Sequence, residues 1–250
     1  MLTPERQQLI LKFIKENKIA TIHQLVKETD SSESTIRRDL IQLEKENKLV
    51  RFHGGAQMIK SKSEETSISE RLTANFSEKK AIAGKAAEYV EKGDCIFLDA
   101  GTTTFHMIEF LRKDTIVVTN GLSLVNECLD RGIETYVVGG RVKSKTKAFI
   151  GKGALEGISA YRFDKSFIGI NGIHLNFGYT TPDPEEAMIK KAAMDLSNKA
   201  YVLADRTKFN QVSFSFVHDL NKASIITDSL GDHEEINQYN QITTVETVKS

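Results

Sequence analysis

The stretch SSESTIRRDLIQLEKENKLVRFHGG, residues 31–55, decides how the first part of this chain folds. Ser32 is a favourable N-cap, because a serine hydroxyl accepts a hydrogen bond from an otherwise unpaired N–H of the first helical turn. Apolar residues then follow at helical spacing, at Ile36, Leu40 and Leu43. The pair Arg37-Arg38 lies off that apolar face. The stretch therefore predicts a short amphipathic helix that presents two arginines to solvent, followed by a basic hairpin.

Two further helices are predicted upstream. The first covers residues 4–16, with Pro4 near its start. The second opens at Thr21, because Thr21 and Gln24 have the spacing of a capping box, and it runs to Thr29. A turn then leads into the helix that Ser32 caps. The order helix, helix, tight turn, helix predicts a helix-turn-helix domain whose last helix enters the major groove of DNA.

The hairpin after this helix predicts a wing. Residues 49–53 alternate like a strand, and Gly54-Gly55 permits a sharp return. Paired arginines suit phosphate contacts and bidentate recognition of guanine. An Arg-Arg pair alone favours the solvated face of an ordinary surface helix, but the neighbouring elements favour DNA. The candidate DNA-binding residues are Ser34, Thr35, Arg37, Arg38, Arg51, His53, Gly54 and Gly55.

Positive charge is modestly concentrated at the N-terminal end. Residues 1–60 hold eleven Lys and Arg residues against eight Asp and Glu residues, whereas the whole chain has 34 of each. Because binding to duplex DNA depends strongly on neutralised phosphates, so small an excess suggests a homo-oligomer, a dimer or a tetramer, that adds weak half-sites together.

The N-terminal motifs carry a family resemblance. The segment T-I-R-R-D-L at residues 35–40 and the segment R-x-H-G-G-A at residues 51–56 resemble the N-terminal domain of the DeoR family of bacterial repressors. The opening MLTPERQQ and the segment SESTIRRDL most resemble the fructose-operon repressors within that family. The resemblance runs along essentially the whole chain and implies double-stranded operator DNA as a partner.

Length and composition limit the other possibilities. A chain of 250 residues accommodates one small and one mid-sized domain. It has no apolar run of membrane-spanning length and no signal-peptide pattern, so a cytoplasmic protein without a membrane partner is expected. Cys95 and Cys128 are expected to be reduced core residues, with a disulfide or redox switch as the less favoured alternative. The Cys and His spacing predicts no metal site, and no cofactor is expected.

The remaining sequence predicts an α/β domain. A polar linker over residues 58–77 is expected to separate a winged helix-turn-helix domain, residues 1–57, from a larger domain, residues 78–250, that binds the effector and forms the oligomer. Strands are predicted at 95–98, 116–118, 135–138, 165–170, 200–204 and 223–227. Helices are predicted at 78–91, 103–111, 122–130 and 184–197. Alternating helices and continuously apolar strands predict a mostly parallel sheet covered on both faces.

Polar and glycine residues follow the predicted strands. Ligands of parallel sheets bind beyond the carboxyl ends of the strands, so these residues are expected to converge on one polar pocket. Gly101 and the following threonines open a helix and suit a phosphate, although a plain N-cap turn is an equal alternative on the motif alone. Glu186 and Lys190 fall on one helix face, where a surface salt bridge is the alternative, and Asp205 and Lys208 also suit a capped loop.

The second half of the chain also resembles the DeoR effector domain, which is similar to ribose-5-phosphate isomerase. The segments that carry this resemblance are LDAGTTT, TN, GGR, IGINGI, D-x-x-E-A-x-x-K and AD-x-x-KF. The resemblance implies a sugar phosphate as partner, fructose 1-phosphate for a fructose operon, with Gly101 to Thr104 and Lys208 on the phosphate. The candidate effector-binding residues are Asp99, Gly101, Thr102, Thr103, Thr104, Asn120, Gly121, Arg141, Asn171, Asp183, Glu186, Lys190, Asp205 and Lys208.

The same comparison disfavours catalysis. An aldose–ketose isomerase needs a carboxylate base at the sugar carbons. The isomerases have an acidic segment where this chain has Gly169-Ile170-Asn171-Gly172-Ile173. No catalytic residue is therefore assigned, and the expected function is that of a repressor relieved by a sugar phosphate. A sugar-phosphate isomerase-like enzyme and a constitutive DNA-binding scaffold are the alternatives.

Overall fold

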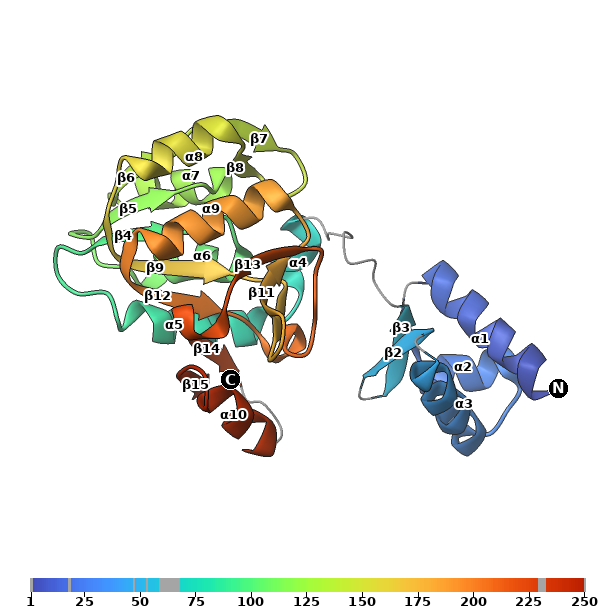
Figure 1. Ribbon diagram of the computed structural model, residues 1–250. Helices are drawn as coiled ribbons and strands as arrows, with labels where there is room; N and C mark the ends of the chain where they lie inside the picture. Colours follow the sequence, from blue (N-terminus) through green and yellow to red (C-terminus); the bar gives the residue numbers. More distant parts are fainter. Residues whose placement is uncertain are drawn as a thin grey trace. The chain divides into compact units, whose positions relative to one another are not determined.

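The computed structural model describes residues 2–17, 19–46, 48–52, 54–58, 68–228 and 233–249. The chain divides into two compact units, Met1–Ser61 and Lys62–Ser250, whose helices and strands are labelled in Figure 1. Each unit is described below by itself. Among the described residues, no helix combines the length and the apolar character needed to cross a membrane.

The first unit is a winged helix. Its elements are α1 (Thr3–Asn17), β1 (Ile19–Thr21), α2 (Ile22–Thr29), α3 (Glu33–Lys45), β2 (Leu49–Phe52) and β3 (Gly55–Met58). The strands form an antiparallel sheet in the order β1-β3-β2. The Thr21–Gln24 capping box and the Ser32 N-cap are both present. The residues at 36, 40 and 43 are buried in one core with residues of α1 and α2, as their spacing predicts.

The second unit, called here the sensor unit, is built on a seven-stranded sheet. Its strands are β4 (Cys95–Leu98), β5 (Ile116–Thr119), β6 (Glu134–Val137), β9 (Phe163–Gly169), β12 (Ser197–Leu203), β14 (Ser224–Asp228) and β15 (Val245–Val248). Their order is β15-β14-β12-β9-β4-β5-β6, and every pairing is parallel. The mostly parallel sheet predicted from the sequence is therefore confirmed.

Helices cover both faces of this sheet (Figure 1). One core cluster joins the sheet to α5 (Phe76–Ala87), α6 (Thr102–Met107) and α7 (Leu122–Asp130). A second joins the opposite face to α8 (Lys152–Ser159), α9 (Pro184–Asp195) and α10 (His233–Asn240). Three helices are shorter than predicted: the chain turns after Ala87, α6 gives way at Ile108 to a 3-10 turn, and α9 ends at Asp195. Both cysteines are free, and burial raises the pKa of Cys128 to about 11.

Smaller elements surround the strand ends. They are α4 (Ile68–Thr73), the hairpin β7 (Arg141–Lys143) and β8 (Ala148–Ile150), and the antiparallel sheet β10 (Gly172–His174), β11 (Gly178–Thr181) and β13 (Ser215–His218). The helix α4 and the start of α5 fall within residues 58–77, the stretch expected to be a linker. Residues 59–67 of that stretch lie outside the described part of the chain.

The chain order places the point of reversal between β4 and β9. From β4 the chain proceeds to β5 and β6 on one side, and it later returns to β9, β12, β14 and β15 on the other side. In open parallel sheets, ligands bind beyond the strand ends at such a point, because the following loops leave in opposite directions. The residues after β4 and β9 are therefore the first place to look for a site.

Candidate nucleic-acid interface and effector site

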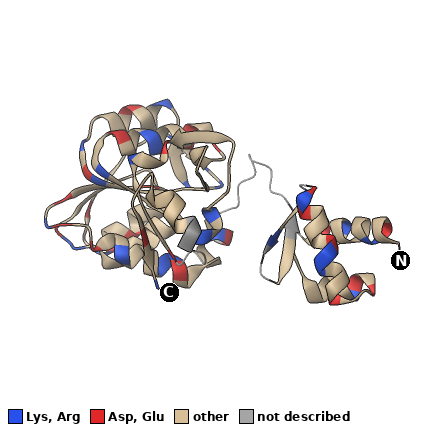
Figure 2. Ribbon diagram, turned by 60° about the horizontal axis from the view of Figure 1, so that its bottom comes forward, with Lys and Arg blue, Asp and Glu red and all other residues tan. Residues whose placement is uncertain are grey.

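The helix α3 presents polar and basic side chains to solvent. Ser34, Arg37 and Arg38 are exposed, and Thr35 is half-buried beside the N-cap. Arg37 donates to Glu33 one turn earlier, with 2.6 Å between Nη2 and Oε1. Arg38 Nε donates to the carbonyl of Ser34 at 3.3 Å. Figure 2 shows the positions of basic and acidic residues interspersed along the helices of this unit.

The hairpin β2–β3 carries the wing residues. Arg51 is exposed and pairs with Glu44 of α3, with 2.7 Å between Nε and Oε2. Gly54 has a φ of 93°, in the left-handed region that glycine adopts without strain, so a glycine is required at this turn. Gly55 is buried in β3, between Phe52 and Thr21, and is therefore less able to contact DNA than its neighbour. His53 lies outside the described residues.

A buried ion pair that sequence reasoning missed orients α3. Arg6 of α1 donates to Asp39 of α3, with 2.5 Å between Nε and Oδ2, and the side chains are 11% and 5% exposed. Asp39 falls among the buried residues of α3 although it is charged. The position of Asp39 within the apolar stripe was the sequence signal that could have predicted a buried partner for it. The pair joins α1 to the buried face of α3, and Arg37 and Arg38 lie on the exposed face of the same helix.

In the sensor unit, Asp99 and Lys190 form an ion pair at the point of reversal. Asp99 follows β4, and its Oδ2 accepts from Lys190 Nζ at 2.5 Å and from the Gly169 backbone N–H, at the end of β9, at 3.0 Å. Asp99 is 1% exposed and Lys190 is 4% exposed. Asp99 Oδ1 is buried and has no hydrogen-bond partner among the described residues. A buried unpaired carboxylate oxygen favours a hydroxyl or amine donor from outside the protein.

Gly169 lets the two strand ends approach each other. A Cβ built at this residue would lie 3.3 Å from Asp99 Oδ2 and 3.8 Å from the Gly101 Cα. A larger side chain would separate these strand ends and lengthen the Gly169–Asp99 hydrogen bond. The absence of a carboxylate at this position, noted from the sequence, therefore has a packing reason.

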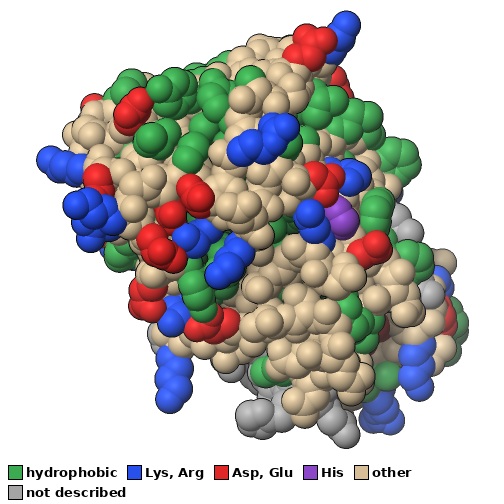
Figure 3. Space-filling view, turned by 60° about the vertical axis from the view of Figure 1, so that its left-hand side comes forward, with side chains coloured by type: hydrophobic (Ala, Val, Ile, Leu, Met, Phe, Trp, Pro, Cys, Tyr) green, Lys and Arg blue, Asp and Glu red, His purple; other side chains and the backbone are tan. Residues whose placement is uncertain are grey.

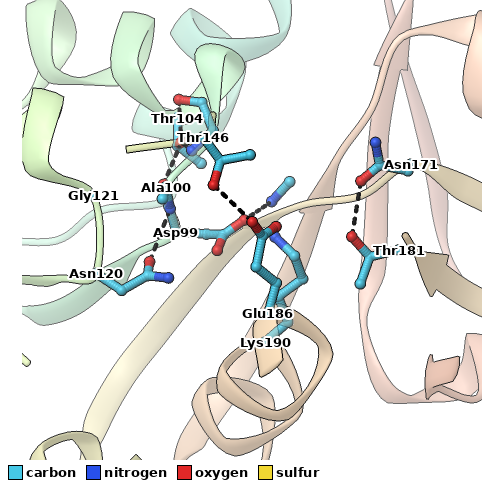
Figure 4. Close-up of polar contacts among 12 residues, drawn as sticks. Asp99, Ala100, Thr104, Asn120, Gly121, Thr146, Asn171, Thr181, Glu186 and Lys190 are labelled. Atoms are coloured by element: carbon cyan, nitrogen blue, oxygen red, sulfur yellow. Dashed lines mark hydrogen bonds and ion pairs between the residues drawn. The ribbon is translucent and has the colours of Figure 1, made fainter. Parts of the chain in front are cut away.

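Glu186 and Lys190 do not pair with each other, although they lie one turn apart on α9. Glu186 Oε1 accepts from Thr146 Oγ1 at 2.7 Å and from Lys143 Nζ at 3.2 Å. Glu186 is 6% exposed. The alternative of a surface salt bridge between Glu186 and Lys190 is therefore wrong, because each is buried against a different element. Figure 4 shows Asp99, Thr146, Glu186 and Lys190 directed toward one another from three segments, because Glu186 and Lys190 both lie on α9.

Asp183 caps α9 and pairs with Lys143, the lysine that also contacts Glu186. Its Oδ1 accepts from the N–H groups of Glu185 and Glu186 at 2.8 and 3.1 Å, and Lys143 Nζ lies 2.8 Å from its Oδ2. Burial raises the pKa of Asp183, but the Lys143 hydrogen bond and these backbone donors outweigh it and hold the pKa below its ordinary value. Lys143 and Thr146, both on the β7–β8 hairpin, were not predicted as site residues.

Two predicted residues hold loops in place. Asn120 Oδ1 accepts from the Ala100 N–H at 2.9 Å, joining the ends of β4 and β5 (Figure 4). Thr104 Oγ1 donates to the Asp99 carbonyl at 2.6 Å and accepts from the Gly101 N–H at 3.1 Å. Thr102 and Thr103 are buried beside it. A Cβ built at Gly121 would lie 3.0 Å from the Ala100 Cα, so a side chain at this residue would displace the loop.

Asn171 stands on the other side of the point of reversal. Its Oδ1 accepts from Thr181 Oγ1 of β11 at 2.9 Å (Figure 4). Thr181 is fully buried, so this bond fixes the end of the small antiparallel sheet against the loop after β9. Arg141, by contrast, has a side chain that is 65% exposed and pairs with Glu185. The structure therefore groups Asn171 with the buried strand ends and leaves Arg141 at the surface.

A second group of charges follows β12. Asp205 Oδ1 accepts from the Thr207 N–H at 3.0 Å and caps the 3-10 turn Arg206–Lys208. Burial raises the pKa of Asp205, but the charge of Lys208 and the Thr207 hydrogen bonds outweigh it and hold the pKa below its ordinary value. Both residues interact electrostatically with Lys79 of α5. Asp205 thus caps a loop, which is the alternative that the sequence left open. It also lies in a cluster of charged residues.

Lys79 is a buried lysine that sequence reasoning missed. It is 5% exposed, and burial lowers its pKa to about 8. Its Nζ donates to the Ala74 carbonyl at 2.7 Å and to the Arg71 carbonyl. The spacing of Lys79, Ile82, Ala83 and Ala86 places it on the buried stripe of α5, unlike the exposed-side Lys80. That spacing was the signal that distinguished the two lysines.

The charged and polar residues at these strand ends are called the strand-end cluster from here on. They are Asp99, Lys143, Thr146, Asp183, Glu186, Lys190, Asp205 and Lys208, together with Lys79. In the described part of the chain, no group of three or more His, Cys, Asp or Glu residues could hold a metal ion. The cluster has buried charges of both signs and suits a small ligand with hydroxyl and anionic groups.

Comparison with protein families shows similarity in both units. A model described as the DeoR-like helix-turn-helix domain matches residues 6–62, and one described as the DeoR C terminal sensor domain matches residues 74–229. The chain is 46% identical over 253 residues to the "Uncharacterized HTH-type transcriptional regulator FruR" of Bacillus subtilis (strain 168), covering 100% of both chains.

Other proteins are more distantly similar. The chain is 30% identical to the lactose phosphotransferase system repressor of Staphylococcus aureus (strain NCTC 8325 / PS 47), covering 93% of this chain and 94% of that one. Among solved structures, ribose 5-phosphate isomerase A of Methanocaldococcus jannaschii matches with a TM-score of 0.41 and 16% identity, over 54% of this chain and 55% of that one. The two regulators named here each match more than nine tenths of this chain.

Proposed function

This chain belongs to the DeoR family of helix-turn-helix transcriptional regulators, and we propose on that premise that it represses a sugar uptake and utilisation operon until a sugar phosphate binds the strand-end cluster. The winged helix is its DNA-binding unit. The observation that carries the effector half of the proposal is the buried Asp99–Lys190 pair at the point of strand reversal, with Asp99 Oδ1 lacking a partner among the described residues.

The chemistry of the cluster supports a sugar phosphate. Carboxylates that already accept from lysine and threonine, as Asp99 and Glu186 do, have lone pairs for sugar hydroxyls. Lys79 and Lys208 supply positive charge for a phosphate beside the loop after β12. In this proposal Gly101 to Thr104 and Lys208 hold the phosphate, as the sequence predicted, and Lys79 joins them. Asp99, Asn171, Glu186 and Lys190 line the sugar.

Fructose 1-phosphate is the effector we propose. Support comes from the opening MLTPERQQ and the SESTIRRDL segment, and from the name of the Bacillus subtilis relative that is 46% identical along its whole length. A ligand with one phosphate suits a site with one pair of neighbouring lysines. A bisphosphate would place its second phosphate near the acidic groups Asp99 and Glu186, which would repel it.

A regulatory rather than a catalytic role follows from the same groups. An isomerase needs a carboxylate free to take a proton from the sugar carbon. Asp99 is paired with Lys190, Glu186 accepts from Lys143 and Thr146, and the segment Gly169–Gly172 has no carboxylate. A coupled assay on pentose and hexose phosphates distinguishes the two roles. Turnover above the buffer rate would establish the enzyme alternative.

We propose that the repressor is a cytoplasmic homo-oligomer. The edge strand β6 and the helices beside it carry exposed apolar side chains, at Leu129, Tyr136, Val137 and Leu155. Figure 3 turns the left side of Figure 1 forward and shows hydrophobic side chains gathered in several groups on that face. Exposed apolar groups of this kind favour association with a second copy. Analytical ultracentrifugation at micromolar concentration tests this, and a monomer at all concentrations contradicts it.

The functional proposal is tested by one variant with two readouts. Lys208→Ala leaves the winged helix unchanged, so it retains the operator affinity of the native chain. It loses positive charge at the phosphate end, so fructose 1-phosphate no longer releases the DNA. The matched control is Lys222→Ala, which removes a surface lysine paired with Asp195 and retains release. Loss of operator binding in Lys208→Ala, with the fold intact, would remove Lys208 from the effector site.

A further inference from the structure

The helix α4 is the first described element after residues 59–67, through which the chain passes from the winged helix to the sensor unit. It is only six residues long and has too few residues to bury a core of its own. Its position therefore depends on what it contacts. It has three attachments to the rest of the sensor unit. Two are to elements that carry residues of the strand-end cluster, and the third is to α6, which begins shortly after Asp99.

The first attachment is to the β7–β8 hairpin. The N–H of Ile68 donates to the Lys145 carbonyl at 3.1 Å. The residue after Lys145 is Thr146, which is 1% exposed and donates to Glu186 Oε1 at 2.7 Å. Lys143, two residues before Lys145, reaches both Glu186 and Asp183. The start of α4 is thus bound to Lys145, and the residues before and after Lys145 in this turn contact candidate sugar-binding carboxylates.

The second attachment is to Lys79. Two of the three protons of its ammonium are used by the carbonyls of Arg71 and Ala74, in the last turn of α4 and just after it. The same ammonium interacts electrostatically with Asp205 and Lys208. The end of α4 is therefore bound by the cation that we place beside the effector phosphate.

The third attachment is to α6. The two helices pack against each other, and α6 begins at Thr102, next to Gly101. Two buried side-chain nitrogens, Arg71 Nε of α4 and His106 Nε2 of α6, have no hydrogen-bond partner among the described residues. Figure 1 shows α4 at the side of the sheet toward which the arrowheads of β9 and β12 point.

We propose that α4 couples effector binding to the tether, the segment of chain that leads from the winged helix to α4. This inference rests on the proposed function. A phosphate ester at Lys79 competes with the Arg71 and Ala74 carbonyls for the ammonium protons, because charge-assisted bonds to a phosphate are stronger than bonds to neutral carbonyls. A sugar that draws Glu186 toward its hydroxyls also displaces Thr146 and the neighbouring Lys145 carbonyl. Both changes loosen α4 at its two ends.

The direction of the effect follows from linkage. The attached position of α4 restricts where the tether begins, and the effector favours the detached position because it binds that state more tightly. Attached α4 is then the state that holds two winged helices at operator spacing, and detachment weakens operator binding. Reciprocity requires operator DNA to weaken effector binding by the same factor.

Hydrogen exchange of the full-length chain tests the attachment directly. The probe is fructose 1-phosphate, with inorganic phosphate as a second probe. Backbone amides of residues 68–79 are expected to exchange about tenfold faster when fructose 1-phosphate is bound, while amides of β4 and β5 are unchanged or slower. Unchanged or slower exchange at residues 68–79, with calorimetry showing that the sugar phosphate is bound, would overturn the coupling role of α4 and leave the proposed function standing.

A pair of variants tests the consequence for DNA. Ile68→Pro removes the N–H that donates to Lys145, at the first position of a helix, where proline is tolerated. We expect its operator affinity without effector to fall about tenfold, with less than about threefold further loss on adding fructose 1-phosphate, a range typical of allosteric coupling. Thr73→Ala is the control, since Thr73 is exposed and bonds only within α4, to the Glu70 carbonyl.

The outcomes separate the two proposals. If Thr73→Ala responds as the native chain does and Ile68→Pro is weakened and insensitive, the coupling role is supported. If Ile68→Pro responds to the sugar phosphate as fully as the native chain does, α4 is not the coupling element. If calorimetry detects no binding of any sugar phosphate to the native chain, the proposed function fails and this inference fails with it.

Discussion

The two units differ in where they keep their charges. At the DNA-binding face of the winged helix, Arg37, Arg38 and Arg51 are exposed, and the carboxylates that pair with Arg37 and Arg51 are exposed too. In the sensor unit, Asp99 and Lys190 are almost wholly buried. Exposed cations are available to a large polyanion whose phosphates are spread over its surface. Buried charges of both signs at strand ends suit a small polar ligand that leaves solvent completely.

The difference also concerns energy. An exposed ion pair contributes little to stability, because water screens it and two side chains lose freedom. Removing one partner of a buried pair leaves an uncompensated charge in a medium of low polarity. Substitution of the exposed arginines of α3 and the wing should therefore change DNA binding, whereas substitution of the buried Asp99–Lys190 pair should change folding.

The largest expected effect is in the strand-end cluster. Lys190→Met leaves Asp99 buried without its cation, and the free energy of unfolding of the sensor unit is expected to fall by about 3–5 kcal/mol. Lys191→Met is the matched control on the same helix, because Lys191 pairs with Asp195 at the surface with a side chain that is 52% exposed. Its loss is expected to stay below about 1 kcal/mol. Urea denaturation followed by circular dichroism measures both, and equal losses would contradict the comparison.

The next effect is on DNA. Arg38→Ala removes an exposed guanidinium from α3 and is expected to cost about 1–3 kcal/mol of operator affinity, roughly fivefold to 150-fold, without changing the unfolding transition. Gel-shift titration at fixed salt measures it. Arg112→Ala, an exposed arginine of the sensor unit that pairs with Asp114, is the control and should bind the operator normally. A destabilised Arg38→Ala would show that this arginine is structural.

A pH effect on the effector follows from Lys79. Lysine is charged below its pKa, and burial lowers that pKa from 10.5 to about 8, so the charge is lost above pH 8 instead of above 10.5. Affinity for fructose 1-phosphate should therefore fall by up to about tenfold per pH unit above pH 8. Calorimetry between pH 7 and 9 measures it. Lys79→Arg keeps the charge throughout and should flatten the profile; an unchanged profile would remove Lys79 from the phosphate site.

The smallest effect concerns the exposed pair on α3. Glu33→Gln removes the partner of Arg37, and stability should change by no more than about 0.5 kcal/mol. Operator affinity should rise slightly, by about twofold, because one negative charge near the phosphates is gone. The same two assays apply. A loss of several kcal/mol here would mean that the exposed and buried pairs do not differ as the comparison requires.

The sequence predicted the elements that have strong periodic patterns. The apolar stripe of α3, the capping box at Thr21 and the continuously apolar strands β4 and β5 were located within a residue or two. The short strands β10, β11 and β13 were not predicted. β11 has the sequence GYTT and is buried at every position, so it shows neither alternation nor an apolar run.

The site was predictable as a set of strand ends but not as a network of partners. The polar residues after β4, β5, β9 and β12 were found from their position. Which residues they bond could not be found, because Asp99 and Lys190 are 91 residues apart and Thr146 and Glu186 are 40 apart. Lys79 was missed because a Lys-Lys pair on a helix is usually solvated. Only its helical spacing from the apolar residues of α5 could have predicted that it is buried.

Fluorescence anisotropy of the full-length chain on DNA from upstream of its own operon, at fixed salt and with a panel of sugar phosphates, measures whether an effector releases the DNA. We expect tight binding that fructose 1-phosphate releases at least tenfold more effectively than glucose 6-phosphate or inorganic phosphate. Tight binding that no sugar phosphate alters would contradict it and would identify the chain as a constitutive DNA-binding scaffold.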